Sequence, residues 1–136
     1  MYTRKVFLTV LFAIAGPVAS QEIDLQAGKN LYMTYCWQCH GQNASGNGPM
    51  AEKFAMTTAD LTSLKVNNNG VFPLEAVARQ IDGRDPLKAH GGQMPLYGPL
   101  FETGYAVTIR LPGGPPMMAG LPLANLIIYL DSLQTE

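Results

Sequence analysis

The residues whose types and spacing point most directly to chemistry lie in the segment Cys36-Trp37-Gln38-Cys39-His40. This segment holds both cysteines of the 136-residue sequence and one of its two histidines. Two thiols one helical turn apart can add to the two vinyl groups of a haem, and an imidazole directly after them can reach the iron from the same side. The spacing therefore predicts that Cys36 and Cys39 attach a haem covalently and that His40 binds its iron.

Two other chemistries could use the same residues. In an oxidising compartment Cys36 and Cys39 could form a disulfide or a thioredoxin-like thiol-redox site, although that fold alternates strands with helices and the pattern of this chain does not. A zinc ion needs four ligands, and Cys36, Cys39, His40 and His90 are all the cysteines and histidines in the sequence. We favour haem attachment and keep thiol redox chemistry and zinc binding as alternatives.

Helices are predicted to position this segment. Hydrophobic spacing, together with breaks at glycine and proline, predicts helices in four segments: 24–38, 50–54, 73–81 and 121–133. The first of them ends in the two cysteines. The sequence has 14 glycines and 10 prolines, which predicts long loops between the helices, as in 85–99. The fold class is therefore predicted to be all-α and loop-rich.

One segment outside the helices has the pattern of a strand. Tyr105, Val107 and Ile109 alternate with more polar residues, which predicts a short strand over 105–111. The surrounding stretch, 104–116, has room for a short hairpin, but no partner strand can be identified from the pattern.

The first 20 residues are predicted to be a signal peptide, which leaves 21–136 as the mature domain. Basic residues precede an apolar run, 6–15, that is too short to span a bilayer, and Ser20 supplies a small residue before cleavage at Gln21. This predicts export to the periplasm and no transmembrane segment in the mature chain. The full sequence has a formal net charge of −1 and no basic stripe, which argues against nucleic-acid binding.

Residues on both sides of the cysteine segment resemble those of the class I bacterial cytochromes c. The matching residues are Gly28 and Tyr32 before the segment, Gly46-Asn47-Gly48-Pro49 after it, and Leu126 and Tyr129 in the last helix. The resemblance covers residues 25–133 and implies a cytochrome c-like fold, in which a few helices surround one covalently bound haem c. It also implies that the first and last helices cross at a small residue, a role that suits Gly28 facing Leu126 and Tyr129.

The second axial ligand is expected to be a methionine, because a methionine opposite histidine suits a low-spin electron carrier and raises its reduction potential. Met94 lies in a loop that can hold sulfur against iron, and it matches the Met-Pro-x-aromatic-Gly ligand loop of many bacterial members of the family. Met117 or Met118, just before the last helix, is the fallback. His90 would give bis-histidine coordination and a lower potential.

The predicted function is electron transfer rather than catalysis. An iron with protein ligands on both faces can change between Fe(III) and Fe(II) but has no open position for a substrate, so we expect a carrier with no enzyme activity of its own. Its partners are expected to be redox proteins met in brief encounters. Two alternatives remain: a cytochrome subunit of a larger oxidoreductase complex, with 100–120 as its docking segment, or a haem sensor with an open distal site.

Overall fold

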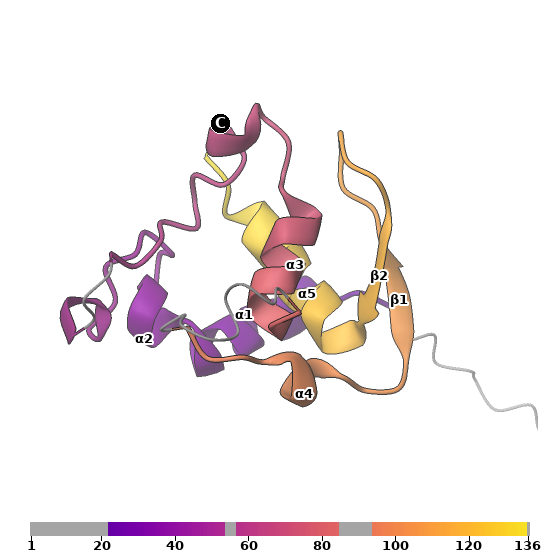
Figure 1. Ribbon diagram of the computed structural model, residues 1–136, viewed down its shortest axis with the longest axis horizontal. Helices are drawn as coiled ribbons and strands as arrows, with labels where there is room; N and C mark the ends of the chain where they lie inside the picture. The colour runs from indigo at the N-terminus through magenta and orange to yellow at the C-terminus, as the bar shows by residue number, and fades with distance from the viewer. Residues whose placement is uncertain (1–21, 54–56, 85–93, 136) are drawn as a thin grey trace, which may run out of the picture.

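The computed structural model describes residues 22–53, 57–84 and 94–135. Within these ranges it contains five α-helices, two short 3₁₀ helices and one two-stranded sheet (Figure 1). This helix-rich architecture with a small hairpin confirms the predicted fold class. The predicted signal segment, 1–20, and the ligand candidate His90 lie outside the described residues. No helix within the described ranges is long and apolar enough to cross a membrane.

The first helix ends earlier than predicted, directly before the first cysteine. Helix α1 spans Leu25–Tyr35 and begins at Asp24, whose carboxylate accepts a free backbone N–H of the first turn at 2.8 Å. Cys36 has a φ of −112°, which departs from regular helix geometry, and a separate four-residue helix, α2 (Trp37–His40), follows it. The single helix predicted over 24–38 is therefore two helices with a break at the first thiol.

Helix α1 crosses the last helix, α5 (Leu121–Ser132), at a glycine. A Cβ atom added to Gly28 would overlap the backbone carbonyl of Asn125 and lie 2.9 Å from the Cβ of Tyr129. The side chain of Asn125 also accepts the backbone N–H of the residue that caps α1, at 2.8 Å. The predicted crossing and the contact with Tyr129 are confirmed. The backbone beside Gly28 belongs to Asn125, whereas Leu126 is fully buried in the core.

Helix α5 is the central element of the fold. Segments from α1, α3, α4 and the sheet all contact it, so it is buried on more than the single apolar face that its spacing predicts. The largest fully buried side chains of the core are Tyr32, Phe72, Ile109, Leu126 and Ile127. Because two of these five belong to α5, the core is centred on this helix.

The sheet is a hairpin that packs on α5 and lies across the molecule from α2 (Figure 1). Strand β1 (Ala106–Ile109) pairs antiparallel with β2 (Met117–Gly120), with Ile109 opposite Met117. The hairpin therefore extends further along the chain than the predicted 104–116. Its second strand escaped prediction because Met-Met-Ala-Gly is short and does not alternate between apolar and polar residues.

Helix α3 (Leu74–Asp82) confirms the helix predicted over 73–81 and ends at Gly83, whose φ of 79° requires the conformational freedom of glycine. The short helix predicted over 50–54 is a single 3₁₀ turn, η1 (Ala51–Lys53). A second 3₁₀ turn, η2, lies further along the chain at Val66–Asn68.

One short helix was not predicted. Helix α4 (Gly98–Phe101) lies at the end of the stretch 85–99, where frequent glycine and proline predict irregular structure. Pro99 lies in its first turn. Backbone N–H groups there have no partner within the helix, so the N–H that proline lacks costs the helix no hydrogen bond. Phe101 at its end is buried in the core, so tertiary packing stabilises a turn that the local sequence does not favour.

Candidate functional site

The cysteine segment is held by the loop that follows it. A helix as short as α2 leaves its last carbonyl groups without partners inside the helix. Three backbone N–H groups of the loop supply them: Met50 to the Gln38 carbonyl at 2.8 Å, Gly48 to Cys39 at 3.0 Å and Gly46 to His40 at 2.8 Å. These hydrogen bonds fix the orientation of the segment without using the two thiols or the imidazole.

Glycine allows this loop to lie directly on the segment. A Cβ atom added to Gly48 would overlap the Gln38 carbonyl and lie 2.6 Å from the carbonyl oxygen of Cys39. Gly46 has a φ of 79°, a conformation that side chains disfavour. Gly46 and Gly48, two of the residues that carry the family resemblance, are therefore required for close contact with the segment.

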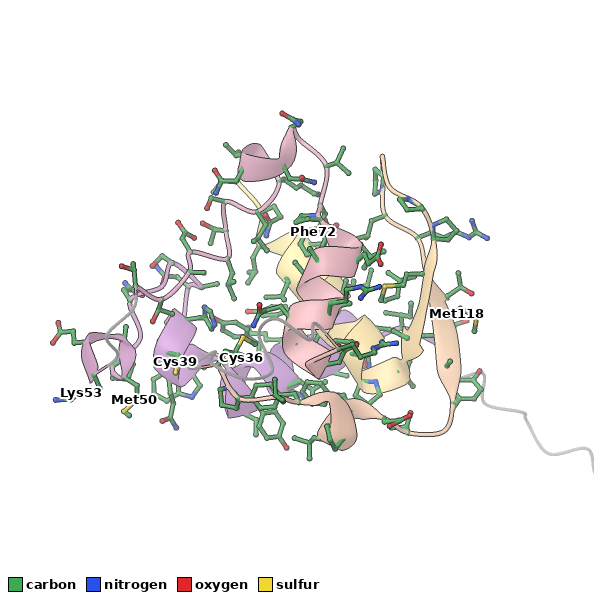
Figure 2. The ribbon with its side chains drawn as sticks, viewed as in Figure 1. Cys36, Cys39, Met50, Lys53, Phe72 and Met118 are labelled. Atoms are coloured by element: carbon green, nitrogen blue, oxygen red, sulfur yellow. The ribbon has the colours of Figure 1, made fainter. Side chains whose placement is uncertain are left out.

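Cys36 and Cys39 lie where α1 meets α2 (Figure 2). Both are free thiols and both are partly buried. Burial, with a smaller contribution from Cys39, raises the pKa of Cys36 to about 12. A thiol-redox site depends on a thiolate at neutral pH, so this environment disfavours the thiol-redox alternative.

Zinc binding also finds no support in the described part of the chain. No group of three or more His, Cys, Asp or Glu side chains is placed there to hold a metal ion. His90, which the zinc alternative requires as a fourth ligand, lies outside the described residues.

The imidazole of His40 is prepared to bind a metal. Its Nδ1 lies 3.0 Å from the backbone carbonyl oxygen of Ala59. A carbonyl only accepts, so Nδ1 carries the proton and the Nε2 lone pair faces away for use as a ligand. Burial lowers the pKa of His40, which favours the neutral form that binds metals. Two free thiols and a neutral, oriented imidazole fit a covalently attached haem.

The segment that carries Met94 is anchored near the cysteines by Tyr97. The Tyr97 N–H donates to the Ile81 carbonyl at the end of α3 at 2.9 Å, and its phenol donates to the Tyr35 carbonyl at the end of α1 at 3.0 Å. The hydrogen bond to Tyr35, the residue before Cys36, places the phenol beside the attachment segment, and burial together with the nearby thiols raises the pKa of Tyr97. Met94 itself is partly buried against the core three residues earlier in the chain.

An aromatic cluster stiffens this anchor. Tyr97 stacks on Phe101 with ring centroids 5.6 Å apart, and both rings meet Tyr35, at 5.7 and 5.8 Å. Aromatic pairs of this geometry add about 0.5–1.5 kcal/mol each beyond the area that they bury. The three rings therefore join α1, α4 and the Met94 segment into one packed unit.

The two fallback methionines lie in strand β2. Met118 is 62% exposed, and Figure 2 shows it on the opposite side of the molecule from Cys36 and Cys39. Met117 is partly buried against the core, opposite Ile109 of β1. The placement of these residues supports Met94 over Met118 as a partner for the cysteine segment.

Two features of the site were not predicted. The Ala59 carbonyl orients His40, and the amide Nε2 of Gln80 lies 3.8 Å from the sulfur of Met94. No sequence signal could have found the first, because every residue has a backbone carbonyl. Gln80 is a polar residue in a partly buried helix, a type too common to single out.

A helix-rich fold that presents a Cys-x-x-Cys-His segment with two free thiols and an oriented imidazole fits a domain that attaches haem covalently. The family model for cytochrome c matches residues 25–100, which is more than half of the sequence. The chain belongs to the cytochrome c family. As a member it carries covalently bound haem c and functions in electron transfer. Comparisons with curated proteins and with solved structures found no match.

Proposed function

We propose that the mature chain, 21–136, is a periplasmic electron carrier that holds one haem c through thioether bonds to Cys36 and Cys39. His40 and Met94 would bind its iron. The observation that carries this proposal is the hydrogen bond from His40 Nδ1 to the Ala59 carbonyl, because it prepares Nε2 as a ligand next to two free thiols. The two anchors of Tyr97 support Met94 as the opposite ligand.

Bound haem c supplies one iron that changes between the ferric and ferrous states. Hydrogen bonds of the polypeptide would hold the ligands in place in both states. The Ala59 carbonyl holds the imidazole of His40, and the tie from Tyr97 to α1 and α3 holds the Met94 segment. Side chains held in this way would keep the reorganisation on electron transfer small, and an iron bound by both His40 and Met94 would leave no position for a substrate. The chain then acts as a carrier and not as an enzyme.

Export is part of the same proposal. The signal-like segment 1–20, with the expected cleavage between Ser20 and Gln21, supports it. Encounters with redox partners would be brief and small in area, as electron-transfer contacts generally are.

A second function has one observation in its favour. Met118 in the hairpin is exposed and lies across the molecule from the cysteine segment, and Tyr105, the residue before strand β1, is 49% exposed. Such a surface suits a cytochrome subunit that stays bound to a larger oxidoreductase. Native purification distinguishes the two functions: a carrier elutes at the mass of one chain with its haem, and a subunit elutes with its partner.

Replacing Met94 with alanine is expected to remove the sulfur ligand, and with it the whole charge-transfer band between sulfur and ferric iron near the infrared edge of the optical spectrum. The reduction potential should fall as well, because the thioether favours ferrous iron. Optical spectra of both oxidation states measure the first effect, and a redox titration measures the second.

Met118→Ala is the matched control, since this methionine is exposed and remote, and it should retain the band. A band that survives in Met94→Ala would refute ligation by Met94 and turn attention to Met117. Rapid binding of carbon monoxide to the reduced wild-type protein would instead show an open distal site and favour a sensor.

A further inference from the structure

We propose that Gln80 is a positioning residue for Met94 and raises the reduction potential of the iron, an inference that rests on the axial ligation by Met94 proposed above. The amide Nε2 of Gln80 lies 3.8 Å from the Met94 sulfur and donates a hydrogen bond to it. The distance suits sulfur, which is larger than oxygen and a weak acceptor. A thioether only accepts, so the amide must present its N–H₂ side to the sulfur.

The fold holds donor and acceptor at a fixed separation. Gln80 lies in the last turn of α3, and the segment after Met94 packs directly onto the end of that helix. The Tyr97 N–H donates to the Ile81 carbonyl at 2.9 Å. A Cβ atom added to Gly98 would overlap the Asp82 carbonyl, so the two backbones are in contact. The amide and the sulfur therefore belong to one packed unit rather than to two independent loops.

A second contact completes this unit. A Cβ atom added to Gly83, the residue that ends α3, would lie 2.7 Å from a terminal methyl group of Leu96. Leu96 is two residues after Met94. The end of α3 is therefore in contact with the chain directly after Met94. A methionine side chain has three rotatable bonds, and a fixed donor selects among its conformations.

The hydrogen bond has an electrostatic consequence for the iron. A thioether sulfur has two lone pairs, and the bond from Gln80 occupies one of them while the other is left for the metal. With Met94 bound to the iron, the positive end of the N–H dipole would act on the iron through the sulfur that it contacts, in a partly buried site where water screens it less than at the surface. Ferric iron carries one more positive charge than ferrous iron, so this dipole destabilises the ferric state and raises the potential.

The experiment compares the purified protein with its haem in four forms: wild type, Gln80→Leu, Gln80→Glu and Gln26→Leu. Gln80→Leu keeps the bulk of the side chain and removes the donor. It should lower the equilibrium constant for reduction roughly three- to tenfold, the upper value being about 59 mV for one electron. Gln80→Glu should lower it further, because a carboxylate near the iron favours the ferric charge.

Gln26→Leu is the matched control, because Gln26 is an exposed helical glutamine whose amide bonds to Asn30 of the same helix. It should leave the potential unchanged. Gln80 is only partly buried, so all variants are expected to fold, and thermal unfolding checks this. A role confined to stability would move the unfolding temperature without producing the graded order of potentials from glutamine through leucine to glutamate.

The possible failures are distinct. Equal potentials in wild type and Gln80→Leu, in a protein that retains its sulfur-to-iron band, would overturn the role of Gln80 alone. An equal shift in Gln26→Leu would do the same, because the effect would then not depend on contact with Met94. A wild-type spectrum with no band that depends on Met94 would overturn the proposed ligation and this inference together.

Discussion

A chain in which both Cys36 and Cys39 are replaced by alanine is expected to carry no covalently bound haem. The two thiols are the only cysteines in the sequence, and both are free. With neither sulfur present no thioether can form, so the intact mass measured under denaturing conditions should equal that of the polypeptide alone. The absorbance of haem should also separate from the protein during denaturing chromatography.

Two controls sharpen this result. Either single replacement leaves one thiol and should retain a haem through one thioether, and Met118→Ala should retain both bonds because Met118 lies across the molecule. A double variant that keeps the added mass of haem would contradict the assignment of the attachment site. Wild-type protein with the bare peptide mass would contradict it even more directly.

Replacing Gly28 with valine is expected to destabilise the protein by about 3 kcal/mol or more. The added side chain would have to occupy the space of the Asn125 backbone carbonyl, and a backbone atom cannot rotate away as a flexible side chain can. The two helices would have to separate, with loss of packing between them. This is a large fraction of the 5–15 kcal/mol that stabilises a typical domain, and urea unfolding of the protein with its haem measures it.

Gly28→Ala should also lower the free energy of unfolding, but by less. Alanine stabilises a helix by about 1 kcal/mol relative to glycine, which offsets part of the cost of the clash. Gly114→Ala is the control: its new Cβ atom would meet only a methyl group of Val71 at 4.0 Å. That change should alter stability by no more than about 0.5 kcal/mol. A Gly28→Val variant as stable as wild type would show that the helices do not meet at this residue.

The attachment segment could be recognised from sequence because its chemistry is local. The thiols and the imidazole of Cys36-Trp37-Gln38-Cys39-His40 belong to five consecutive residues. The C-terminal end of α3 could be predicted for a similar reason, because Gly83 ends the helix through its own backbone preference. The crossing at Gly28 could be predicted from the family resemblance. The sequence also supported it, because a glycine within a helix lowers stability and this cost is usually offset by the close approach of another segment.

Features that depend on distant partners could not be predicted. The strand 117–120 exists because β1 pairs with it and α5 packs beneath both, whereas its own four residues have no strand pattern. Helix α4 depends on the burial of Phe101. His40 donates a hydrogen bond to a distant backbone carbonyl, that of Ala59, and Met94 accepts one from Gln80, a glutamine 14 residues away. Pairings of this kind emerge only when the chain is folded.

The contact between α1 and α5 joins residues that are far apart in the chain. The hydrogen bond from the Asp24 N–H to the Asn125 side chain spans 101 positions. The residues between Asp24 and Asn125 form a loop that this contact helps to close, and the contact can form only after the last helix has been synthesised. Because closure entropy grows slowly with length, doubling such a loop would cost only about 0.6 kcal/mol. Surface insertions between the two helices should therefore be tolerated during evolution, whereas loss of either terminal helix would open the entire domain.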